Sequence, residues 1–125
     1  MSALPGHALR YLAEGGLGLV QRRPLFLTLF VTARCPLSCG HCFYRDEAMA
    51  AKADEELTLD EIRQLSRRLP SIPKLIITGG EPFLRDDLAA ITRALYDGRS
   101  RSRQITVPTS GLYPDRVVDY VQELL

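Results

Sequence analysis

The order of apolar runs and amphipathic stretches most constrains what this chain can fold into. Three short runs rich in β-formers occupy residues 25–31, 74–78 and 104–107. Each is followed by a loop and then by a stretch in which apolar residues recur at helical spacing. Such alternation favours parallel strands joined by right-handed crossovers, and therefore an α/β fold. We expect a parallel (βα)3 arrangement.

The three expected helices carry clear start signals. Thr58 can form a capping box with Glu61 at the start of the first, and a proline follows its last apolar residue. Asp86 or Asp87 should cap the second, and Pro114 should open the third. The inward faces are expected to be built from Leu59, Ile62, Leu65, Leu69, Leu88, Ile91, Leu95, Val117, Val121, Leu124 and Leu125.

The first apolar run is almost free of polar residues, which is typical of a strand covered on both faces of its sheet. Residues 1–23 should form an N-terminal extension, which is either a short helix opened by Pro5 or a frayed segment. Residues 24–125 should form the single domain that a chain of 125 residues with 46% hydrophobic content can support.

Charge and hydropathy exclude several classes of function. The net charge is +1, with 25% charged residues, so nucleic-acid binding is not expected. The one basic run, residues 99–103, is expected to be a solvated loop. The most apolar stretch is far below the roughly 20 residues that a bilayer span needs. With no signal-peptide pattern at the N-terminus, we expect a cytoplasmic protein that does not contact a membrane.

All three cysteines lie between residues 35 and 42. A disulfide framework would scatter an even number along the chain, so this cluster favours a metal site. The spacing of Cys35, Cys39 and Cys42 lets three thiolates hold three corners of one iron–sulfur cube. Because there is no fourth cysteine, one iron must be open or bound by another kind of ligand.

Two other interpretations of the cysteines stay open on the residues alone. One is a structural zinc site completed by His41 or His7, although His41 adjoins Cys42 and can hardly converge with it on one tetrahedral ion. The other is that the thiols are simply buried apolar groups, which Pro36 and Gly40 argue against because they shape a loop.

Three segments with unusual chemistry follow the three expected strands. They are the cysteine loop, Gly79-Gly80-Glu81, and Thr109-Ser110-Gly111. Because ligands gather at the carboxyl ends of parallel strands, we expect these segments to meet at one edge of the sheet.

The two leading motifs resemble the signature of the radical S-adenosylmethionine (AdoMet) superfamily. Cys35-x3-Cys39-x2-Cys42 is followed by Phe43-Tyr44, and Thr78-Gly79-Gly80-Glu81-Pro82 is similar to that family's GGE motif. The resemblance covers the chain from about Leu25 onward. The residues that follow the two motifs, Phe43-Tyr44 and Pro82-Phe83-Leu84, are similar to those of the branch that modifies peptides or builds cofactors.

The resemblance implies a [4Fe–4S] cluster held by the three cysteines and AdoMet bound to its open iron. A donor such as flavodoxin or ferredoxin would supply one electron. The resulting 5′-deoxyadenosyl radical would abstract hydrogen from a small-molecule or peptide substrate. The implied AdoMet-binding residues are His41 near the adenine, Gly79, Gly80 and Glu81 at the methionine end, and Ser110 at the third strand.

The family also implies a partial (βα)6, TIM-like barrel, of which the three expected units would be the first half. We therefore expect the chain to be part of a longer enzyme. The alternative is a truncated, non-catalytic module that binds the cluster and AdoMet.

Overall fold

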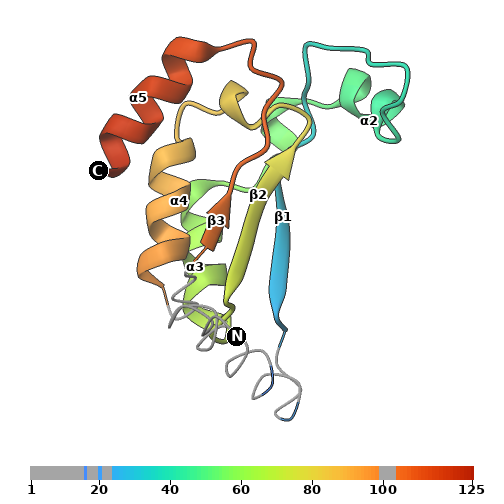
Figure 1. Ribbon diagram of the computed structural model, residues 1–125. Coiled ribbons are helices and arrows are strands. Elements are labelled where there is room, and N and C mark those ends of the chain that lie inside the picture. Colours follow the sequence, from blue (N-terminus) through green and yellow to red (C-terminus); the bar gives the residue numbers. More distant parts are fainter. Residues whose placement is uncertain (1–15, 17–19, 21–23, 99–103) are drawn as a thin grey trace, which may run out of the picture.

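A computed structural model describes residues 16, 20, 24–98 and 104–125. Its elements follow one another as β1 (Phe26–Thr32), α2 (Arg45–Ala50), η1 (Ala53–Glu55), α3 (Leu59–Arg68), β2 (Lys74–Gly79), η2 (Pro82–Leu84), α4 (Leu88–Asp97), β3 (Gln104–Thr106) and α5 (Pro114–Leu124). The alternation predicted from the sequence is confirmed, and the protein has an α/β fold (Figure 1).

The three strands form one parallel sheet in the order β1-β2-β3. Phe26 pairs with Lys74, and the register shifts between Phe30 and Thr32, where β1 meets the end of β2. In a parallel sheet the carboxyl ends of all strands lie at the same edge. The cysteine loop and α2 lie beyond that edge (Figure 1).

The core lies between one face of the sheet and the helices α3, α4 and α5. Alternate residues of the strands point into it, because successive side chains of a strand face opposite ways. Its buried members are Val31, Ile62, Leu75, Ile77, Phe83, Leu88, Ile91 and Leu95, with Val117 and Tyr120 of α5 packed against them. Most of the helix positions expected to face inward are therefore confirmed.

The opposite face of the sheet is open in the described part of the chain. Phe26 is 64% exposed and Phe30 is 47% exposed, while the alternate residues of β1 face the helices. Within the described residues β1 is covered on one face only, contrary to the expectation of a strand covered on both faces. Aromatic residues that stand on an open face produce the same continuous apolar run as a doubly covered strand.

The capping box of α3 is confirmed. Glu61 N donates to Thr58 Oγ1 at 3.3 Å, and Thr58 N donates to Glu61 Oε2 at 2.8 Å. Asp87 is the N-cap residue of α4, but its carboxylate binds Arg85 instead of the helix backbone. Leu125, the residue after α5, is fully exposed, so its expected place on the inner face of the helix was wrong.

Several expectations fall on parts of the chain that the structure does not describe. The short helix from Pro5, most of the extension at residues 1–23, and the basic run at 99–103 lie outside the described residues. The two-part division at residue 24 stays a prediction. None of the described helices is long and apolar enough to cross a membrane.

Candidate functional site

The end of β2 is bonded to the chain immediately before the first cysteine. Gly80 N donates to Thr32 O at 3.0 Å, and Glu81 N donates to Arg34 O at 2.9 Å. Cys35 follows Arg34 directly. The structure therefore brings the cysteine loop and the Gly79–Glu81 segment together, as predicted.

Only glycine allows this approach of two backbones. A Cβ atom at Gly79 would lie 2.0 Å from Thr32 O, and one at Gly80 would lie 2.3 Å from Arg34 O. Both distances are far inside van der Waals contact with backbone atoms that cannot rotate away. The two glycines therefore serve the packing of β2 against the start of the cysteine loop.

Glu81 joins the ends of β2 and β3. Its side chain is fully buried, and Oε1 accepts hydrogen bonds from Phe83 N at 3.1 Å and Thr109 Oγ1 at 2.9 Å. Oε2 accepts from Ser110 N at 2.7 Å and Ser110 Oγ at 2.5 Å. One carboxylate thus satisfies four donors, and the third strand end joins the other two.

These bonds keep Glu81 ionised. Burial alone would raise the pKa of its carboxyl, but the hydrogen bonds from Ser110, Phe83 and Thr109 outweigh it, so the pKa lies below the usual value. Both carboxylate oxygens are used by the chain itself. The predicted contact of Glu81 with the methionine end of AdoMet stays a prediction, whereas its hydrogen bonds within the fold are observed.

The three cysteines lie in an irregular loop with little internal bonding. Cys35 and Cys39 are half-buried, Cys42 is exposed, and all three are free thiols. A turn joins Cys42 N to Cys39 O at 3.1 Å. Among the described residues, no three His, Cys, Asp or Glu side chains form a group that could hold a metal ion. The three sulfurs are thus not gathered, and their role as cluster ligands stays a prediction.

The donor set nevertheless suits an iron–sulfur cluster, since thiolates are its usual ligands. His41 is exposed and, like the three cysteines, belongs to no assembled metal-binding group among the described residues, and His7 lies outside them, so the zinc interpretation is not tested. The buried-thiol interpretation fails for Cys42, which is exposed. Phe43 is 89% exposed and belongs to no core, whereas Tyr44 packs on Phe30 with ring centroids 5.8 Å apart.

A polar network beside the loop was missed from the sequence. Glu56 accepts hydrogen bonds from Thr32 Oγ1 at 2.5 Å and from Arg34 Nε at 2.6 Å. Arg34 N in turn donates to Thr32 Oγ1 at 3.0 Å. No periodicity or spacing links charged residues so far apart in the sequence, so only the fold reveals the pairing.

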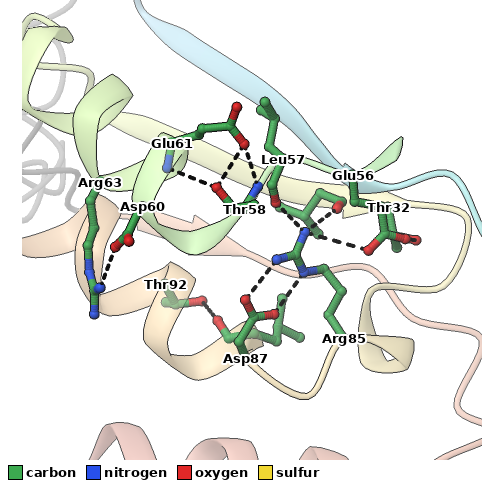
Figure 2. A network of polar contacts seen from close by, with 12 residues as sticks. Thr32, Glu56, Leu57, Thr58, Asp60, Glu61, Arg63, Arg85, Asp87 and Thr92 are labelled. Atoms are coloured by element: carbon green, nitrogen blue, oxygen red, sulfur yellow. Dashed lines mark hydrogen bonds and ion pairs between the residues drawn. The ribbon is translucent and has the colours of Figure 1, made fainter. Parts of the chain in front are cut away.

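Arg85 is the second centre of this network (Figure 2). Its side chain is 7% exposed and makes a two-pronged contact with Asp87 at 2.8 and 2.7 Å. Its Nη1 also donates to Val31 O at 3.0 Å and to Leu57 O at 2.8 Å. One guanidinium thus ties the end of β1 to the segments that precede α3 and α4.

The network shifts the ionisation of its acids. Burial raises the pKa of Glu56, but hydrogen bonds from Arg34 and Thr32, with the charges of Arg34 and Arg85, bring it below the usual value. The hydrogen bond from Arg85 lowers the pKa of Asp87. Glu56 as a hydrogen-bond acceptor raises the pKa of Arg34. These groups are therefore charged at neutral pH.

Several characterised proteins are similar to this chain. The Molybdenum cofactor biosynthesis protein 1 of Dictyostelium discoideum is 34% identical over 78% of the chain and 16% of its own length. The Pre-heme d1 synthase of Dinoroseobacter shibae is 36% identical over 65% of the chain and 19% of its own length. The GTP 3′,8-cyclase of Erythrobacter litoralis is 39% identical over 72% of the chain and 28% of its own length.

The chain spans less than a third of each of these relatives. Their names describe a cyclase, a synthase and a cofactor-biosynthesis protein. The sequence model of the Radical SAM superfamily matches residues 29–125, which include the cysteine loop and all three strand ends. The chain therefore belongs to the radical SAM superfamily of enzymes.

Proposed function

We propose that this chain holds a [4Fe–4S] cluster through Cys35, Cys39 and Cys42 and binds AdoMet beside it, at the ends of β1, β2 and β3. One observation carries the proposal: the segment that opens the cysteine loop is hydrogen-bonded to the Gly79–Glu81 segment. The segments that carry the two family motifs thus lie next to one another, which supports the proposal.

The chemistry that this cofactor pair supplies when bound is the reductive cleavage of AdoMet to methionine and a 5′-deoxyadenosyl radical, which removes hydrogen from a substrate. The chain contributes the three thiolates. Gly79 and Gly80 keep the β2 backbone against the start of the loop, and Glu81 keeps Ser110 in place. AdoMet contacts would come from the loops that carry His41, Gly80 and Ser110 and from Gly79 at the end of β2.

The sheet supports a barrel architecture. Sequential parallel order with three helices packed on one face is the arrangement in which a (βα)n barrel begins. We propose that β1–β3 are the first half of a partial (βα)6 barrel, whose interior would be lined by the open face that carries Phe26 and Phe30.

For the substrate we propose a small molecule. The named relatives include a GTP 3′,8-cyclase and a Pre-heme d1 synthase. Because each matches about two thirds or more of this chain at similar identity, their matched parts overlap, and we propose that the chain carries chemistry common to both and not the recognition of either substrate. We further propose a flavodoxin- or ferredoxin-type electron donor and a cytoplasmic setting, which protects the cluster from oxidation.

The test is anaerobic reconstitution of the chain with iron and sulfide, followed by reduction with dithionite in the presence of AdoMet. We expect a brown [4Fe–4S] chromophore and the release of 5′-deoxyadenosine. A stable cluster that binds AdoMet without cleavage would indicate the non-catalytic module instead. A chain that assembles no cluster, or that holds zinc, would refute the proposal.

Cys39→Ala supplies the residue-level prediction for this site. The variant should lose stable cluster assembly and keep its helical circular dichroism, because the loop belongs to no helix or strand. Ser38→Ala, one residue away and exposed, is the matched control and should assemble the cluster normally. A full cluster spectrum in Cys39→Ala would contradict the ligand assignment.

A further inference from the structure

A partly buried ion pair closes the base of the segment that carries all three cysteines. Arg34 and Glu56 are 22 residues apart in the sequence, yet Arg34 Nε lies 2.6 Å from Glu56 Oε1. A second contact joins Arg34 Nη2 to Glu56 Oε2 at 3.2 Å. Residues 35–55 therefore leave the body of the molecule and return to it at a single point.

The carboxylate of Glu56 is held from two further directions. Thr32 Oγ1 donates to it at 2.5 Å, and Arg85 Nη1 lies 3.6 Å from its Oε2. Arg85 is fixed in turn by the carbonyl oxygen of Val31. It also donates to the carbonyl oxygen of Leu57 (Figure 2). The Arg34–Glu56 pair is thus anchored to Val31 and Thr32 at the end of β1 and to Leu57. The pair can move only together with these residues.

Little else fixes the segment within the described residues. Its helix α2 makes no extensive contact with another described helix or strand, and Ala48 is the one buried residue of α2. A tilted ring contact joins Tyr44 to Phe30. The placement of the cysteine loop therefore depends on how firmly its two ends are held.

We propose that Glu56 is a positioning residue for the cysteine loop, which acts through Arg34 by holding the two ends of residues 35–55 together. Closing a chain segment costs conformational entropy, and a pair that closes it in advance lowers the cost of gathering three thiolates. The inference rests on the proposed function only for what the thiolates bind; the clamp itself is a property of the metal-free chain.

The experiment compares Glu56→Gln with Asp60→Asn in the full chain. Asp60→Asn removes the same negative charge, but Asp60 pairs with Arg63 on the exposed side of α3 and not with Arg34. Hydrogen exchange of the metal-free proteins is followed by mass spectrometry. We expect exchange across residues 32–55 to be about tenfold faster in Glu56→Gln, because a charge-assisted contact is lost, and unchanged in Asp60→Asn. Iron release to a chelator from reconstituted protein should accelerate by a similar factor.

Arg34→Gln is the second variant, and it keeps the contacts of Glu56 with Thr32 and Arg85. It should reproduce the local acceleration while the thermal midpoint stays close to that of the parent chain, so it serves if Glu56→Gln does not fold. Exchange that is unchanged in this segment, or raised equally over the whole chain, would overturn the inference. If the parent chain assembles no cluster, the proposed function fails, and the exchange data on the metal-free proteins still decide the clamp.

Discussion

At Gly80 the carbonyl oxygens of Ala33 and Arg34 stand where any other residue would carry its Cβ, at 2.6 and 2.3 Å. Gly80→Ala should therefore force β2 away from the start of the cysteine loop. We expect a loss of about 3 kcal/mol or more in the free energy of unfolding, measured by urea denaturation.

Gly40→Ala is the matched control for this change. Gly40 lies inside the cysteine loop, but a Cβ there would meet no atom within 4 Å. We expect its free energy of unfolding to stay within about 0.5 kcal/mol of the parent value. Equal stability of the two variants would show that β1 and β2 separate more easily than the structure implies.

A substitution at Glu81 tests whether this acidic residue of the family motif stabilises the folded chain. In Glu81→Gln an amide group would face donors of Ser110, Phe83 or Thr109 that now meet a carboxylate. We expect a loss of about 2–4 kcal/mol in the free energy of unfolding. The exposed Glu55→Gln should change little. If Glu81→Gln instead loses AdoMet affinity at full stability, the carboxylate acts mainly on the cofactor.

At the scale of single elements, α3 depends on its first turn. Thr58→Ala removes one half of the capping box and leaves Glu61 N without its side-chain acceptor. We expect a loss of about 1 kcal/mol in the free energy of unfolding. Ser71→Ala, in the exposed connection after α3, should be neutral. An unchanged Thr58→Ala would mean that packing of Ile62 alone fixes the start of the helix.

The elements that could be predicted from the sequence are those with local signals. The capping box, the apolar spacing of α4 and the strand runs each lie within a few residues, so β1–β3 and α3–α5 were found within one or two residues of their observed ends. The short helix α2 was missed because only Ala48 is buried in it, which leaves no apolar periodicity.

The candidate site also has one part that the sequence could predict and one part that it could not. The meeting of the cysteine loop with Gly79–Glu81 followed from parallel topology, since the carboxyl ends of the strands share one edge. The bonds of Glu81 to Thr109 and Ser110, and of Arg34 to Glu56, join residues more than 20 positions apart. Nothing in a single sequence indicates which polar residues pair at such a separation, so these contacts required the three-dimensional structure.

At the scale of the whole molecule, acidic side chains couple folding to pH. The carboxyls of Glu56, Glu81 and Asp87 all have pKa values below their usual ones. Their contribution to stability is therefore complete above the usual pKa of 4.5 for glutamate and 3.8 for aspartate. It is lost as the pH falls below these values, because the unfolded chain takes up protons first.

We expect the urea midpoint to be nearly constant from pH 7 to pH 5 and to fall steeply below about pH 4.5. In Glu56→Gln the fall should be shallower, since one of the coupled carboxyls is absent. A midpoint that rises on acidification below pH 4.5 would contradict the sign worked out from these groups.

Because Arg34 and Glu56 are paired, the geometry of the sheet does not depend on how many residues lie between them. With both ends joined side by side, residues could be inserted into or removed from the stretch between them without displacing β1 or α3. The segment can in that sense be exchanged as a unit. A protein engineer could graft a foreign metal-binding loop of different length between the same two residues and expect the scaffold to accept it.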